Sequence, residues 1–92
     1  MATIQKGNNK FYIGENEETP IAEITFKPKN EQTIIADHTY VSDELRGEGI
    51  AGKLLEALID YARKENKKIV PVCSYVKQKM ERTEEYHDLI AK

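Results

Sequence analysis

A glycine-punctuated segment carries the clearest chemistry in the chain. Residues 46–52 read Arg-Gly-Glu-Gly-Ile-Ala-Gly and precede a run of apolar residues at helical spacing. Glycines let backbone amides turn toward a ligand, and a helix N-terminus carries about half a positive charge. This combination suits an anion such as a phosphate. Because Glu48 lies in the same loop, amides rather than side-chain cations would hold the anion. A tight strand-to-helix connection explains the glycines equally well on these grounds alone.

Three side chains outside the loop could move protons or form a covalent bond. Cys73 is the single cysteine, and a thiol becomes nucleophilic when its pKa falls, although free cysteines are more often small buried hydrophobic groups. His38 is predicted to share a strand face with Ile34 and Ala36, which favours a core histidine; a proton relay is the alternative, because imidazole titrates near neutral pH. Tyr75 could donate its hydroxyl or simply pack in the core.

Two common nucleotide-binding motifs do not fit. No glycine stands in the GxxxxGK[ST] relation that a P-loop needs. Gly47, Gly49 and Gly52 do have the GxGxxG spacing of a dinucleotide-binding fold. That motif should follow the first strand of a parallel sheet and precede an acidic residue on the next strand. Here the motif follows predicted antiparallel strands, and the next predicted strand has no acidic residue.

The elements that position these residues begin with an antiparallel meander. Short links between β-prone runs favour consecutive hairpins, and alternation of apolar and polar residues from Ala22 to Lys27 is typical of a half-buried strand. A turn is predicted at Pro28–Glu31. The predicted strands are Phe11–Ile13, Ile21–Phe26 and Thr33–Val41. The third is expected to carry Ile34, Ala36, His38 and Tyr40 on one face.

After the loop, the apolar residues recur at the spacing of a helix. The apolar positions fit one face of a helix that ends near Asn66, and they are Ile50, Leu54, Leu55, Leu58, Ile59 and Ala62. A strand at Ile69–Cys73 follows, and Pro71 marks where it should part from its neighbour, since proline cannot donate to a sheet. Ser74–Met80 predicts a short helix, and Glu84–Ile90 one more turn. Strand, helix and strand make a right-handed parallel crossover. The predicted fold class is therefore α+β, a meander followed by a β-α-β unit and a short C-terminal helix.

Composition and charge exclude several classes of protein. The 92 residues have a net charge of −2 and a pI of about 5.7, with 39% hydrophobic and 33% charged residues. These values favour a single globular domain that spans residues 1–92, and they argue against a disordered chain. The absence of a basic stripe argues against nucleic acid, and no apolar run reaches the ~20 residues of a membrane span. With no secretory pattern and a single cysteine, we expect a cytoplasmic protein without a disulfide or a thiolate metal site.

The loop in this context resembles a known family. Arg46-x-x-Gly49-x-Ala51 is similar to the (Gln/Arg)-x-x-Gly-x-(Gly/Ala) signature of the GNAT superfamily of N-acetyltransferases. The resemblance covers about residues 20 to 80, including the following helix and the strand that contains Pro71. His38-Thr39-x-Val41 and Cys73-x-Tyr75 resemble the small stand-alone branch of that family.

The resemblance implies a co-substrate and a reaction. Acetyl-CoA would donate its acetyl group to an amine of unknown identity, without a metal. The loop would bind the coenzyme pyrophosphate, and the strand before it would bind the pantetheine and polarise the thioester carbonyl through its amides. The implied coenzyme-binding residues are Thr39, Tyr40, Val41, Arg46, Gly47, Glu48, Gly49, Ile50, Ala51 and Gly52.

The resemblance also suggests roles for the three reactive side chains. Cys73 would lie beside the thioester, where it could protonate the leaving thiolate or accept the acetyl group. His38 would act as base or proton relay, and Tyr75 would donate to the thiolate or lie against the pantetheine. Lys77 and Lys79 could meet a coenzyme phosphate, although charges on a short helix are usually solvated. The alternative function is a non-catalytic acyl-CoA-binding module or a partner-dependent subunit.

Overall fold

A five-stranded mixed sheet organises the protein. The computed structural model describes residues 3–91. Its strands are β1 (Gln5–Gly7), β2 (Lys10–Ile13), β3 (Ala22–Asn30), β4 (Thr33–Val41) and β5 (Lys68–Pro71). They lie in the order β1-β2-β3-β4-β5, with antiparallel neighbours except for the parallel pair β4 and β5. The predicted meander and parallel crossover are confirmed.

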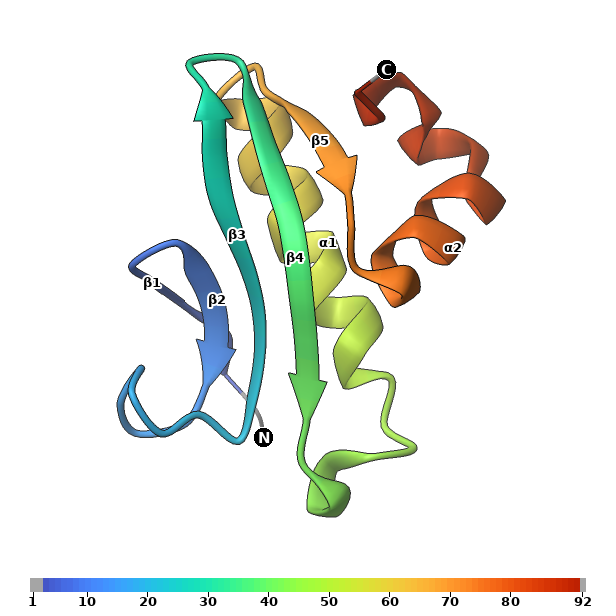
Figure 1. The fold of residues 1–92 in the computed structure, drawn as a ribbon. Helices are drawn as coiled ribbons and strands as arrows, with labels where there is room; N and C mark the ends of the chain where they lie inside the picture. Colours follow the sequence, from blue (N-terminus) through green and yellow to red (C-terminus); the bar gives the residue numbers. More distant parts are fainter. Residues whose placement is uncertain (1–2, 92) are drawn as a thin grey trace.

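Helices fill the segments between and after the last two strands. The 3₁₀ helix η1 (Asp43–Leu45) and the helix α1 (Ile50–Lys64) connect β4 to β5. The helix α2 (Ser74–Arg82) and the 3₁₀ helix η2 (Glu84–Leu89) follow β5. Figure 1 shows α1 behind the sheet, whereas α2 and η2 lie beyond β5. No helix within residues 3–91 is long and apolar enough to cross a membrane.

The apolar face of α1 forms the centre of the core. All six apolar positions that predicted the helix are buried, and they pack against the inward side chains of β2, β3 and β4, such as Phe11, Ile24 and Ile34. The helix is followed by Asn66 in the left-handed conformation (φ 56°), as expected for a residue after a helix end. The strong 3.6-residue period therefore identified both the helix and its buried face.

The first hairpin was not predicted. β1 pairs with β2 across a tight turn at Asn8 and Asn9, in which Asn9 has φ 60°. Asparagine tolerates this left-handed conformation better than most residues. β1 itself reads Gln-Lys-Gly and has no apolar alternation, so nothing in its side chains marks it as a strand.

Two strand ends differ from the prediction. β3 continues through Pro28 to Asn30, so the predicted turn at Pro28–Glu31 is wrong. Pro28 pairs with Ile34 next to a register irregularity, a place where a sheet tolerates proline. β5 ends at Pro71, and Cys73 lies outside the strand as the residue that caps α2.

Candidate functional site

The loop glycines adopt conformations that other residues avoid. Gly47 has φ 88° and Gly49 has φ 71°, both in the region where a Cβ atom causes steric strain. A Cβ built on either residue would meet no heavy atom within 4 Å. The positive φ angles, rather than a lack of space for a side chain, therefore favour glycine at both positions. The space into which a side chain would point is open.

The N-terminus of α1 presents free amides to this space. Gly49 caps the helix without a side-chain hydrogen bond, and the first turn contains no acidic residue. The backbone ladder begins with the Lys53 amide, which donates to the Gly49 carbonyl over 3.1 Å. The amides of residues 50–52 have no partner inside a helix. They form a group of donors at the positive end of the helix dipole, which is suited to an anion.

A cavity of about 300 Å³ lies over these amides. It joins the end of β4, the loop and the second residue of α2. Its lining residues are Val41, Leu45, Arg46, Gly47, Gly49, Ile50, Ala51, Gly52 and Tyr75. The exposed Arg46 forms an ion pair with Asp43 at 3.2 Å. Glu48 does not line the cavity, whereas Leu45, which the sequence did not single out, does.

The sheet opens beside this cavity. Parallel pairing of β4 and β5 stops at Ala36 and Pro71, where the amides of Val72 and Cys73 both donate to the Ala36 carbonyl, at 3.0 and 2.9 Å. Beyond that point, residues 39–41 of β4 pair only with β3 among the described residues. The predicted divergence near Pro71 is confirmed, and it leaves one backbone edge of β4 available to a ligand.

Cys73 lies at the point where the strands separate. Its half-buried thiol donates to the Thr39 hydroxyl over 3.5 Å, which joins the start of α2 to β4. Thr39 pairs with Ile24, and Ile24 faces the core. The thiol and the Thr39 hydroxyl therefore lie on the α1 side of the sheet, the side that also carries the loop cavity.

Tyr75 lines the cavity from the α2 side. Its hydroxyl oxygen would stand 3.7 Å from a Cβ atom built on Gly52. Burial raises the pKa of Tyr75 above the ordinary 10.0, and the neighbouring Tyr86 and Cys73 raise it further. The hydroxyl is therefore protonated at neutral pH, and it can donate a hydrogen bond without bringing a negative charge toward a bound anion.

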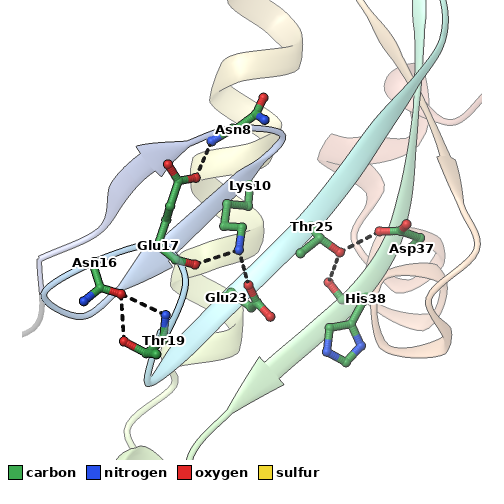
Figure 2. A network of polar contacts seen from close by, with 9 residues as sticks. All are labelled: Asn8, Lys10, Asn16, Glu17, Thr19, Glu23, Thr25, Asp37 and His38. Carbon is green, nitrogen blue, oxygen red and sulfur yellow. Dashed lines mark hydrogen bonds and ion pairs between the residues drawn. The ribbon is translucent and has the colours of Figure 1, made fainter.

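The predicted position of His38 is wrong. Thr25 pairs with His38 and Phe26 with Ala36, so Asp37 is an extra residue in β4, a β-bulge. The bulge reverses the alternation: Ala36 faces the core, whereas His38 is exposed on the opposite face. Figure 2 shows His38 beside Thr25, whose hydroxyl donates to Asp37 Oδ1 over 2.6 Å.

Tyr40 follows His38 onto the exposed face. Its side chain is 42% exposed, so the expected common face with Ile34 and Ala36 does not extend past the bulge. The same face carries the ion pair between Lys10 and Glu23 at 3.0 Å (Figure 2). Of the three reactive side chains singled out in the sequence, Cys73 and Tyr75 come together on the α1 side, and His38 does not join them.

Comparison with known proteins agrees with this geometry. A model of the GCN5-related N-acetyl-transferase family matches residues 10–89. The solution structure of a GCN5-like N-acetyltransferase candidate from Staphylococcus aureus is similar over 97% of this chain and 87% of that one, with 44% identity and a TM-score of 0.81.

A more distant structure shares the fold. A GNAT family acetyltransferase from Elizabethkingia anophelis, solved with acetyl-CoA bound, is 19% identical with a TM-score of 0.59. The similarity covers 79% of this chain and 50% of that one. No curated protein matches significantly. Since the family model spans most of the sequence, the chain belongs to the GCN5-related N-acetyltransferase family, whose members transfer an acetyl group from acetyl-CoA to an amine.

Proposed function

We propose that the protein acetylates an amine with acetyl-CoA, and that the coenzyme lies across the loop cavity and the open edge of β4. One observation carries this proposal: within residues 3–91, the amides at the start of α1 and the end of β4 at Val41, both without a backbone partner on the cavity side, border a single cavity. The amides of residues 50–52 would hold the pyrophosphate. The backbone of Thr39, Tyr40 and Val41 would bind the pantetheine. The acetyl-CoA in the Elizabethkingia anophelis relative supports the choice of ligand.

A pantetheine in this direction would bring the thioester near Cys73. A chain that starts at the loop cavity and follows β4 toward the point of divergence passes Val41 and then Thr39, whose hydroxyl contacts the Cys73 thiol. Backbone amides of this part of β4 would donate to the thioester carbonyl oxygen. Such donors stabilise the oxyanion that forms on that oxygen.

The transfer itself is a direct substitution at the thioester carbon. The amine nitrogen attacks this carbon and forms the C–N bond, while the negative charge moves to the carbonyl oxygen. The C–S bond then breaks, the nitrogen loses a proton, and the departing thiolate gains one. We assign the donation of that proton to Cys73, whose thiol lies at the point of strand divergence and contacts Thr39.

Tyr75 has a binding role in this arrangement. It lines the loop cavity, and its neutral hydroxyl can donate to a phosphate or pantetheine oxygen. The exposed His38 would serve as a base only for an amine that approaches from the face away from α1. That role stays a prediction. Assays of acetylation with a panel of amines would identify the acceptor.

A matched pair of loop variants tests the coenzyme site. Gly49→Asn places a side chain in the open space above the loop, and asparagine tolerates the left-handed backbone there. Loss of one charge-assisted hydrogen bond, worth about 1.5–3 kcal/mol, predicts at least a roughly tenfold weaker acetyl-CoA affinity by calorimetry.

Glu44→Asn is the control, because the exposed Glu44 lies in η1, just before the loop, and does not line the cavity. Its affinity for acetyl-CoA should stay within about twofold of the parent protein, as expected for a surface change. Equal affinities in the two variants would remove the loop from the coenzyme site. Acetylation of an amine panel then tests turnover: saturable binding without any acetylated product would leave a coenzyme-binding module.

A further inference from the structure

Two large apolar side chains are exposed beside the opening between β4 and β5. Within residues 3–91, Tyr40 and Val72 are the only large hydrophobic residues with exposed side chains, at 42% and 62%. Tyr40 lies on β4, and Val72 follows the last residue of β5. The Val72 amide donates to the Ala36 carbonyl over 3.0 Å, so Val72 still lies beside β4. Single exposed apolar residues are common, whereas two beside one opening indicate a contact surface.

Both side chains lie away from the face that α1 covers. After the bulge, His38 and Tyr40 are exposed on the far face of β4, and Thr39 between them contacts the Cys73 thiol on the α1 side. Val72 immediately precedes Cys73, and neighbouring side chains of an extended chain point to opposite sides. The exposed side chain of Val72 therefore lies on the same side of the sheet as His38 and Tyr40.

The carboxylates next to this surface already have partners. Asp37 accepts a hydrogen bond from the Thr25 hydroxyl over 2.6 Å. Glu23, the cross-strand neighbour of Tyr40, forms an ion pair with Lys10 at 3.0 Å (Figure 2). A ligand with several positive charges would have to disrupt one of these contacts to find a carboxylate, whereas an apolar group would not.

We propose that the acceptor is a primary amine carried on an apolar group, and that Tyr40 and Val72 select it by contact with that group. This inference rests on the proposed acetyl transfer and deepens it by naming the class of acceptor. The amine nitrogen enters the opening where Cys73 lies, and the apolar group covers side chains that water now contacts. Removal of this apolar surface from water stabilises the complex. His38, two residues before Tyr40 on the same face, is placed to take the proton that the nitrogen loses.

A series of primary alkylamines tests the apolar preference. Ethylamine, n-butylamine and n-hexylamine have nearly equal basicity, so differences in kcat/KM report contact with the alkyl group. Full burial of one methylene corresponds to about fourfold, and partial burial of four predicts an increase of at least about tenfold from ethylamine to n-hexylamine. The increase should appear mainly in KM, because the contact is made before and during the reaction. Spermidine, with its additional ammonium groups, should react no faster than ethylamine.

Val72→Thr and Val70→Thr form a matched pair. Each replaces a methyl group by a hydroxyl with little change in shape. Val70 also faces away from α1, but it pairs with Ile35 inside the β4–β5 ladder, above the opening. Val72→Thr should lower the ratio of kcat/KM for n-hexylamine to that for ethylamine by about threefold, and Tyr40→Thr should lower it further. Val70→Thr should keep this ratio within about twofold of the parent value.

Three results would overturn the proposal in different ways. A flat alkylamine series, or a preference that survives in both Val72→Thr and Tyr40→Thr, would remove the apolar selection and leave acetyl transfer standing. A dimer of the parent protein in size-exclusion chromatography that Val72→Thr dissociates, with the amine preference unchanged, would assign the surface to a second copy of the chain. Binding of acetyl-CoA without acetylation of any amine would refute the proposed acetyl transfer, and this inference would fail with it.

Discussion

Cys73 and Tyr75 lie two residues apart and serve different parts of the proposed site. The Cys73 thiol contacts Thr39 where β4 and β5 separate. The Tyr75 hydroxyl lies near Gly52, in the lining of the loop cavity. A side chain beside the thioester should affect the chemical step, whereas one beside the phosphates should affect binding.

The pair Cys73→Ala and Tyr75→Phe separates these roles. Loss of a general acid typically lowers a rate by about 10²–10⁴-fold. Cys73→Ala should therefore lower kcat with little change in the acetyl-CoA Kd. Tyr75→Phe should raise the Kd by a few fold, because it removes about one neutral hydrogen bond to the coenzyme. Its effect on kcat should be smaller. Steady-state kinetics and calorimetry on both variants make the comparison. The assignment is reversed if Cys73→Ala changes only binding and Tyr75→Phe only kcat.

At the level of single residues, sequence reasoning located backbone features better than side-chain directions. The loop glycines and Asn66 were identified because their conformations favour particular residue types. The face of His38 was assigned wrongly because the bulge at Asp37 shifts every later side chain of β4 by one position. The contact between Thr25 and Asp37 that accompanies this bulge joins two strands and has no local sequence signal.

Among the elements, α2 and η2 pack against the core through Val76, Met80 and Leu89, and η2 is also held by polar contacts. Arg63 on α1 donates to both carboxylate oxygens of Asp88 and to the Glu85 carbonyl. Lys68 also donates to the Asp88 carbonyl. These contacts hold η2 against α1 and β5, next to the helix that carries Tyr75. Their partners lie 20 or more residues apart in the sequence, so the sequence did not predict them.

The ion pair predicts how stability depends on pH. The hydrogen bond from Arg63 lowers the pKa of Asp88 below its ordinary value of 3.8 in the folded protein. The ionised carboxylate therefore stabilises the fold above that value, and the stabilisation is lost as the pH falls through the lower folded pKa. Asp88→Asn should lower Tm at neutral pH, and the difference from the parent protein should disappear in strong acid.

Asp60→Asn provides the control for this prediction. Asp60 is an exposed carboxylate on α1 that forms no ion pair among the described residues. Thermal unfolding of both variants at neutral and acidic pH isolates the Arg63–Asp88 contact. A Tm difference for Asp88→Asn that is the same at both pH values would show that the ion pair is not its cause.

For the molecule as a whole, the order of elements was predictable and the loop cavity was not. The change from strand alternation to helical spacing identified the meander, the loop, α1 and the return strand in sequence order. The loop cavity depends on where α2 packs after the chain leaves the sheet at Pro71. This packing brings Tyr75 beside Gly52, which lies 23 residues earlier in the chain, counted from Tyr75 to Gly52. No local pattern encodes it.

In the proposed complex, acetyl-CoA lies over the start of α1 and along the edge of β4 that faces away from β3. Titration of acetyl-CoA into isotope-labelled protein, followed by backbone amide shifts, tests it most directly. We expect saturable shifts at residues 39–41 and 46–52, with little change in β1, which lies at the far edge of the sheet. Absence of shifts at millimolar ligand, or shifts confined to the face that carries His38, would contradict it.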